Sequence, residues 1–294
     1  MTGVLILRKP KSWTSHDVVA KVRGILREKQ IGHLGTLDPM ATGVLPLVVG
    51  TATRLIEFAS FDKEYRATCL LGKRTDSGDV TGTVLEEKPW DGLEPGKVRE
   101  AALSLKALTE QVPPMVSAVK RDGRKLYELA REGIEVERKP RPIRIEDLEV
   151  TSMELPRVRF RVVCSPGTYV RSLCETLGET LGVGGCLESL ERTRVGPFPL
   201  ERSVTLEVLE SLVKDGKVQG ALLPASGLAG HLPSVTLADS ELTAFCHGRE
   251  VRAKLEQGQL ARVMNSQGLL CGIVEGAGEG VGRPRKVFGI EGWP

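Results

Sequence analysis

Residues 32–43 read GHLGTLDPMATG, and the interpretation of the whole chain starts from this glycine-rich stretch. Pro39 biases the preceding Asp38 toward an extended backbone. Glycine permits tight turns and close approach of a ligand, and the stretch contains Gly32, Gly35 and Gly43. An Asp-Pro pair in such a loop is usually only a turn, yet a carboxylate at a rigid loop tip can also act as a nucleophile or base. Such a carboxylate needs a cationic partner once substrate excludes water, and Arg171 is a candidate whose distance from Asp38 the residues leave open.

The segments around this loop alternate between short strands and amphipathic helices. Thr14 opens a helix, with Asp17 three residues later as a variant of the capping box. A turn over 165–173 leads into another helix, which glycines end after residue 181. Periodicity predicts further helices at 97–108 and 205–213, and strands at 3–7, 44–50, 64–71, 143–150 and 158–164. Because strands and helices mix without strict alternation, the predicted fold class is α+β.

Two other stretches suggest how the chain is divided. Residues 111–142 are basic, and they read either as a solvated loop or as a clamp on a phosphate backbone. Residues 222–233 are rich in Pro, Gly and Ala and are predicted to be a linker. Short strand candidates follow, as in a small β-barrel, at 234–237, 249–255, 260–264, 269–274 and 286–290. We therefore predict a catalytic domain over 1–230, with an insertion at 111–142, and a second domain over 231–294.

The composition is that of an ordinary globular protein, with 40% hydrophobic and 27% charged residues among 294. The net charge of +3 neither demands nor excludes a nucleic-acid partner. The 6 cysteines lack C-x-x-C spacing and the 4 histidines complete no ligand set, so we expect no metal and a reducing, cytoplasmic compartment. No apolar run reaches the ~18 residues of a membrane span, so we expect no membrane partner.

Two stretches that contain glycine are similar to phosphate-binding motifs but do not match them fully. Residues 276–282, GAGEGVG, break the dinucleotide spacing at Val281 and precede no helix, which predicts a hairpin loop. Residues 92–97, GLEPGK, are one residue short of a P-loop and lack its following Ser or Thr. The usual phosphate chemistries are therefore unsupported, and Asp38 remains the candidate.

The motif HLGTLDPMATGVLP resembles the catalytic motif of the bacterial tRNA pseudouridine-55 synthases, the TruB family. The resemblance extends over nearly the whole chain, through blocks at 8–19, 61–82, 111–133, 167–178 and 187–198. Residues from about 231 onward look like a PUA domain, a small RNA-binding barrel. The resemblance implies a pseudouridine-synthase fold with a mixed, mainly antiparallel sheet, an RNA-binding insertion and a small C-terminal β-barrel.

The resemblance also implies an activity, namely isomerisation of uridine 55 in the tRNA T-loop to pseudouridine without a cofactor. The partner would be the T stem-loop of tRNA, and the enzyme is expected to act as a monomer. Carried over to this chain, Asp38 is the catalytic aspartate, Tyr65 stacks on the target base and assists deprotonation, and Arg171 pairs with Asp38. Whether Asp38 attacks the sugar C1′, attacks C6 of the base or removes a sugar proton stays open.

Further residues are implied in binding the RNA. Base flipping costs about a few kcal/mol, and the stack left behind must be filled. The resemblance gives that filling role to His33, the holding of the flipped nucleotide to Asp79, and the lining of the pocket to Tyr169 and Leu190. The candidates for phosphate contacts in the insertion are Lys120, Arg121, Arg124 and Lys125.

Three positions depart from the family pattern, because Ser12 replaces a common glycine, Val116 a common aromatic residue and Glu191 a common arginine. Two other functions compete with the isomerase. One is an RNA chaperone without chemistry, and the other is a carboxylate-dependent hydrolase, although glycosidases ordinarily employ two carboxylates. Pseudouridine in the product, with no released uracil, would separate the three.

Overall fold

The computed structural model describes residues 1–117, 119–121, 123–134 and 136–288, without the side chains of Lys120, Arg121, Lys125 and Arg131. Its centre is a nine-stranded sheet in which all pairs are antiparallel except β13 with β3. The order is β11 (Ile145–Glu154), β12 (Arg157–Cys164), β4 (Lys63–Leu71), β13 (Gly185–Val195), β3 (Thr42–Val49), β1 (Gly3–Lys9) and β15 (Leu222–Leu223), with β2 (Ile31–His33) on β3 and β14 (Phe198–Pro199) on β13. The predicted α+β class with a mixed, mainly antiparallel sheet is confirmed.

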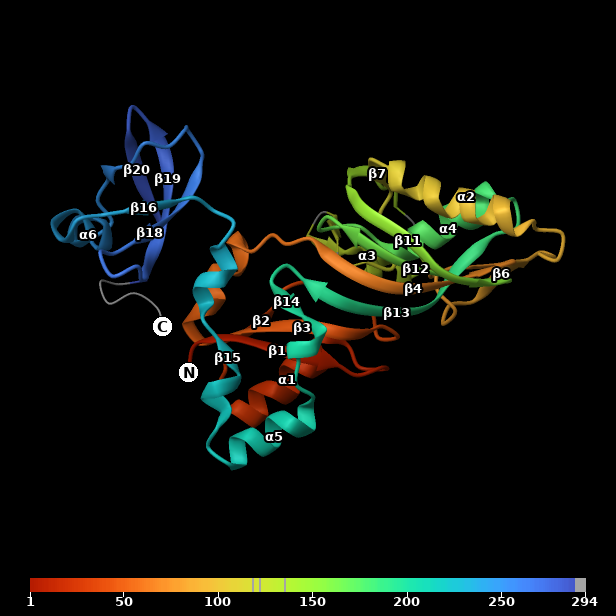
Figure 1. The fold of residues 1–294 in the computed structure, drawn as a ribbon, viewed down its shortest axis with the longest axis horizontal. Helices are drawn as coiled ribbons and strands as arrows, with labels where there is room; N and C mark the ends of the chain where they lie inside the picture. The colour runs from red at the N-terminus through yellow and green to blue at the C-terminus, as the bar shows by residue number, and fades with distance from the viewer. Residues whose placement is uncertain (118, 122, 135, 289–294) are drawn as a thin grey trace.

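Each half of the sheet has its own pair of helices (Figure 1). Helices α2 (Pro95–Ser104) and α4 (Val170–Thr180) pack on the half made of β11, β12, β4 and β13, where Phe160 and Leu173 are buried in one apolar cluster. Helices α1 (Ser15–Leu26) and α5 (Leu206–Lys214) pack on β1 and β3, where Leu45 and Leu209 belong to another. The two halves of the sheet, joined at β13 and β3, therefore pack against separate apolar clusters, and β3 also contributes Val44 and Val48 to a third cluster.

That junction is short and depends on one glycine. Strands β13 and β3 pair only through Glu191 with Thr42 and Arg192 with Gly43. Gly43 has a φ of +104°, and a Cβ placed on it would lie 2.2 Å from the Arg192 carbonyl oxygen. The close approach that Gly43 allows is therefore to the backbone of β13, and the expectation that this glycine makes room for a ligand is wrong.

Most predicted elements are present, and the capping box of α1 is confirmed because Thr14 and Asp17 exchange side-chain and backbone hydrogen bonds. The central strand β13 was not predicted, since two register shifts break its alternation and put charged residues on both faces. The stretch 222–233 is no free linker. Leu222–Leu223 pairs with β1, and small residues let the 3₁₀ helix Ala225–Ala229 pack into the core.

The C-terminal segment forms its own five-stranded sheet, as expected for the small β domain (Figure 1). Its order is β16 (Ser234–Thr236), β18 (Leu260–Met264), β19 (Leu270–Gly278), β20 (Val281–Val287) and β17 (Val251–Arg252), and the unpredicted helix α6 (Asp239–Cys246) packs on it. The predicted hairpin at 276–282 is confirmed, the strand predicted at 249–255 is only two residues long, and residues 289–290 lie outside the described part. Lys286 forms an ion pair with Glu57 at 2.7 Å, which ties this sheet to the 3₁₀ helix Gly50–Phe58.

The basic insertion begins and ends on one small ladder. Strand β7 (Glu110–Gln111) pairs with β10 (Arg141–Pro142), so the two ends of residues 111–142 lie side by side. Between them come the hairpin of β8 (Lys120–Arg121) with β9 (Arg124–Lys125) and the helix α3 (Leu126–Arg131). A second hairpin, β5 (Lys73–Thr75) with β6 (Val84–Glu87), encloses the loop predicted at 75–82. Among the described residues no helix has both the length and the apolar character that a membrane crossing requires.

The junction of β13 and β3 predicts the effect of replacing Gly43. A Gly43→Ala variant suffers both the cost of a positive φ, about 1–2 kcal/mol, and overlap with the β13 backbone, so we expect it to lose more than about 3 kcal/mol of unfolding free energy. Gly216 has a φ of +70° with no atom within 4 Å of an added Cβ, so Gly216→Ala is the matched control and should lose only the backbone term. Urea unfolding of both variants measures the difference, and equal losses would contradict the close contact.

Candidate active site

Five of the predicted site residues line one cavity of about 220 Å³. They come from four separate parts of the chain: the loop before β3, strand β4, the start of α4 and strand β13. The five are Asp38, Tyr65, Tyr169, Arg171 and Leu190. The fold therefore brings together residues as far apart in the chain as Asp38 and Leu190.

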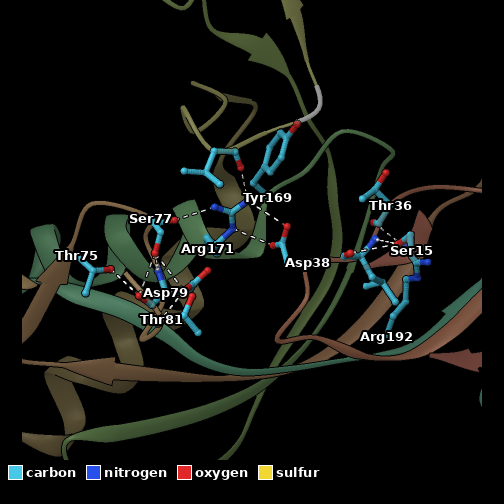
Figure 2. A network of polar contacts seen from close by, with 12 residues as sticks. Ser15, Thr36, Asp38, Thr75, Ser77, Asp79, Thr81, Tyr169, Arg171 and Arg192 are labelled. Atoms are coloured by element: carbon cyan, nitrogen blue, oxygen red, sulfur yellow. Dashed lines mark hydrogen bonds and ion pairs between the residues drawn. The ribbon is translucent and has the colours of Figure 1, made fainter. Parts of the chain in front are cut away.

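The centre of the cavity is an ion pair between Asp38 and Arg171 (Figure 2). Arg171 Nε lies 3.0 Å from Asp38 Oδ2, and Arg171 Nη2 donates to Asp38 Oδ1 at 3.4 Å. The arginine side chain is only 3% exposed whereas the aspartate is 33% exposed. The planar fork of arginine suits such a two-point contact. The pairing that the sequence left open is present, and it leaves the carboxylate facing the cavity.

The same guanidinium holds two further segments. Arg171 Nη1 donates to the Ser77 carbonyl at 2.7 Å, and Nη2 donates to the Val116 carbonyl at 2.7 Å. Arg171 therefore links the Asp38 loop, the 75–82 loop and the base of the insertion. Because the contact at residue 116 uses the backbone, the departure to valine at this position leaves it intact.

The Asp38 loop is held from the N-terminal side by polar contacts to its backbone. Ser15 Oγ accepts from the Leu37 amide at 2.9 Å and lies 3.2 Å from the Leu37 carbonyl, to which it donates. The fully buried Lys9 donates to the Pro39 carbonyl at 3.1 Å, and burial lowers the pKa of this amine to about 8. The Ser12 amide also donates to Pro39 at 2.8 Å, with Ser12 at a φ of +70°. That positive φ explains why glycine is common at this position.

The loop is held from the opposite side by Arg192 of β13. Its fully buried guanidinium donates to the carbonyls of Val44 at 2.8 Å, Gly35 at 3.0 Å and Thr36 at 3.3 Å. Figure 2 labels Arg192 and Thr36. Burial lowers the pKa of Arg192. Sequence reasoning missed both cations: Lys9 looked like an ordinary charge at the end of a predicted strand, and Arg192 lies in β13, which was not predicted. Both cations lie inside the blocks 8–19 and 187–198 that carry the resemblance, which is the signal that could have drawn attention to them.

Two tyrosines contribute differently to the cavity. Tyr65 is buried on β4 beside Arg192, and burial raises the pKa of its phenol, so the hydroxyl keeps its proton at neutral pH. Tyr169 is held through its backbone, since its amide donates to Gln111 Oε1 at 2.8 Å and its carbonyl accepts from Gln111 Nε2 at 3.1 Å. Gln111, which sequence reasoning missed, therefore connects the start of α4 to the base of the insertion.

Two predicted residues lie outside the cavity lining. His33 stands on β2 with its ring 5.9 Å from that of His16, and its buried Nδ1 has no hydrogen-bond partner among the described residues. Burial lowers the pKa of His33 to about 4, so the ring is neutral at pH 7. The Asp79 carboxylate accepts from Ser77 Oγ at 3.1 Å and from the Thr81 amide at 2.9 Å and hydroxyl at 2.5 Å (Figure 2). Asp79 thus shapes the loop that presents the Ser77 carbonyl to Arg171.

The structure describes only some of the basic side chains that were predicted to bind phosphate in the insertion. The side chains of Lys120, Arg121 and Lys125 lie outside the described residues. Arg124 is exposed and forms an ion pair with Glu132. The phosphate contacts predicted for this hairpin therefore stay predictions.

Family models match most of the chain. Residues 23–170 match "TruB family pseudouridylate synthase (N terminal domain)", residues 171–228 match "tRNA pseudouridylate synthase B C-terminal domain", and residues 233–288 match "Pseudouridine synthase II TruB, C-terminal". The chain is 43% identical over 286 residues to "tRNA pseudouridine synthase B" of Aromatoleum aromaticum, covering 97% of this chain and 92% of that protein. It is 48% identical over 238 residues to the protein of that name from Geobacter sulfurreducens, covering 81% and 78%.

Solved structures with the same fold include chains of multi-subunit complexes, one of them with bound RNA. The structure of an H/ACA RNP bound to a substrate RNA containing 2′-deoxyuridine contains a chain with a TM-score of 0.75 and 28% identity, covering 99% of this chain and 87% of that one. A Cbf5-Nop10-Gar1 complex gives a TM-score of 0.74 and 30% identity over 98% and 84%. The similarity spans both the central sheet and the C-terminal sheet.

The buried, neutral His33 predicts a pH dependence of stability. An unfolded histidine titrates near pH 6.5, whereas the pKa of His33 in the folded protein is lowered to about 4. Between these values the unfolded chain binds the extra proton, so unfolding free energy should fall as pH falls from 6.5 toward 4. His33→Gln should flatten that slope in urea unfolding across this range, with the same substitution at exposed His247 as the control. An unchanged slope in His33→Gln would contradict the buried neutral ring.

Proposed function

The chain belongs to the TruB family of pseudouridylate synthases, and from that premise we propose that it converts uridine 55 of the tRNA T-loop to pseudouridine by means of Asp38. It is a tRNA pseudouridine synthase, an isomerase, as its curated relatives are. The observation that carries the proposal for Asp38 is its ion pair with Arg171 at the wall of the cavity. Among the described residues that line this cavity, Asp38 is the only carboxylate.

The reaction moves one glycosidic bond and leaves the atoms of the RNA otherwise unchanged. The bond from C1′ to N1 breaks, the base turns, and a bond from C1′ to C5 forms. The C5 proton leaves and N1 gains a proton, so there is no net oxidation or reduction. Whether Asp38 first attacks C1′, attacks C6 or removes a sugar proton, its carboxylate must be held still against the nucleotide. The contacts of Lys9, Ser15 and Arg192 to the loop backbone supply that rigidity.

Binding must supply the free energy for flipping the target base out of its stack, about a few kcal/mol. In the proposed complex the base enters the cavity between Asp38 and Tyr65, and the His33 ring fills the vacated position. A neutral ring suits stacking among bases, and burial keeps His33 neutral. Attraction between the phosphate backbone and basic side chains offsets the cost of flipping.

We also propose that the enzyme acts as a monomer in the cytoplasm, binds the T stem-loop of tRNA and uses no metal ion. One chain supplies Asp38, Tyr65 and Arg171, which supports a monomer. All six cysteines are free thiols, which suits a reducing compartment. An RNA chaperone would leave uridine unchanged, and a hydrolase would release uracil, so analysis of the product RNA separates both from the isomerase.

Asp38→Asn should abolish turnover while leaving tRNA affinity within about tenfold, or about 1.4 kcal/mol. The reason is that the carboxylate is assigned to chemistry, whereas affinity comes from contacts spread over the RNA. Tritium release from C5-labelled uridine measures turnover, and filter binding measures affinity. Asp215→Asn, at the exposed end of α5, is the matched control and should keep full activity. Residual Asp38→Asn activity above about 1% of wild type would remove Asp38 from the mechanism.

Arg171→Lys keeps the positive charge but loses the planar fork that reaches three segments at once. We expect its single-turnover rate to fall by about tenfold or more, since about 1.4 kcal/mol of lost positioning suffices for that. Rapid-quench measurement on a T stem-loop RNA gives this rate, and filter binding on the same RNA separates it from affinity. A wild-type rate would show that Arg171 does not position Asp38.

A further inference from the structure

Lys63 is a cation of the cavity that the proposed chemistry does not use. It is the first residue of β4 and lies two positions before Tyr65, so both side chains stand on the same face of the strand. Both line the cavity that contains Asp38. Its ammonium group lies at Gly35, where a Cβ built on the glycine would be 3.1 Å from Lys63 Nζ.

No carboxylate among the described residues lies within ion-pair distance, 4.0 Å, of Lys63 Nζ. Three carboxylates are near in the chain or the cavity, and all are already engaged. Glu64 pairs with Arg161 at 2.7 Å. Asp62 pairs with Arg144 at 2.8 Å, and Asp38 pairs with Arg171. Burial and the neighbouring Arg192 lower the pKa of Lys63 to about 8, which leaves the amine mostly protonated at pH 7. A cation that is largely removed from water and lacks an anion is costly, so its position favours an anionic ligand.

The place of this cation relative to the loop indicates which anion it meets. Lys63 Nζ lies beside Gly35. Gly35 itself lies between His33 and Asp38 in the sequence of the loop. In the proposed complex His33 occupies the stack and the flipped base lies at Asp38. The backbone that joins the flipped nucleotide to its stacked neighbour must therefore pass along residues 33–38. We propose that Lys63 Nζ binds the phosphodiester next to the flipped nucleotide, an inference that rests on the proposed function.

Gly35 supports this assignment because, without a side chain, it leaves room for the ammonium group of Lys63. Its φ is +95°, and a side chain at this position would press on the Lys63 Nζ and Cε atoms at 3.1 and 3.2 Å. Arg192 Nη2 donates a hydrogen bond to the Gly35 carbonyl at 3.0 Å, so another cation already fixes this part of the loop backbone. Lys63 is consequently not needed to hold the loop, and its donors remain for the RNA.

The test is a double-mutant cycle that removes the charge of Lys63, the charge of one phosphodiester, or both. T stem-loop RNAs carry a methylphosphonate, which has no charge, at the linkage on the 5′ or the 3′ side of the target uridine. Filter binding compares each RNA with its native form for wild type, Lys63→Met, Lys63→Arg and the control Lys214→Met. Lys214 lies in the last turn of α5, a helix that contributes none of the described residues that line the cavity and that lies beside α1 (Figure 1).

We expect Lys63→Met to bind native RNA about tenfold or more weakly, the range for a lost hydrogen bond to a charged group. Its salt slope should fall by about 0.7 to 0.9. Wild type should lose a similar factor on one of the two methylphosphonate RNAs, and Lys63→Met should lose nothing further on that RNA. Lys63→Arg should retain most of the affinity, and Lys214→Met should respond to both RNAs as wild type does.

The proposal would be overturned if the affinity losses from Lys63→Met and from the methylphosphonate were additive at both linkages. Unchanged affinity of Lys63→Met for native RNA would also overturn it. A Lys63 that instead transfers a proton would show additive binding losses together with lost turnover in both Lys63→Met and Lys63→Arg, which also overturns it. Thermal unfolding of each variant identifies any loss that is merely structural. Because the cycle measures binding, it is independent of turnover, whereas failure of the proposed function appears as absence of pseudouridine in wild-type product.

Discussion

The arrangement of the site depends on one ion pair, between Asp38 and Arg171. The guanidinium is almost fully buried and uses all three nitrogens, so its plane is set by Asp38, Ser77 and Val116 together. These three residues belong to the loop before β3, the loop between β5 and β6, and the insertion. Any shift of one segment therefore changes the contacts of the others, and the position of the carboxylate reports on all of them.

A second constraint is that buried cations, rather than carboxylates, hold the Asp38 loop. Lys9 and Arg192 are fully buried, and each donates to several backbone carbonyls. Carbonyls satisfy the donors without neutralising their charge, so positive charge accumulates around a single cavity carboxylate. Such a field favours a polyanion such as RNA. The close packing of Gly43 on β13 brings Arg192 within reach of the loop, which links the fold directly to the electrostatics.

Much of this could be predicted from the sequence, for identifiable reasons. Asp38 and Arg171 lie in short motifs whose residue order is distinctive, and Thr14 with Asp17 form a local capping box whose partners are three residues apart. The remainder depends on contacts between distant segments. Strand β13 escaped prediction because its bulges break the alternation, and with it the part played by Arg192 was missed. Lys63 reads as an ordinary strand-end lysine until the tertiary structure shows that it has no acidic neighbour within ion-pair distance among the described residues.

The most direct test of the account is release of tritium from a T stem-loop RNA labelled at C5 of the target uridine, with the RNA and the free bases analysed together. We expect one tritium released per RNA, pseudouridine at position 55 and no free uracil. Retention of the label, or its appearance in released uracil, would contradict an isomerisation carried out in the Asp38 cavity.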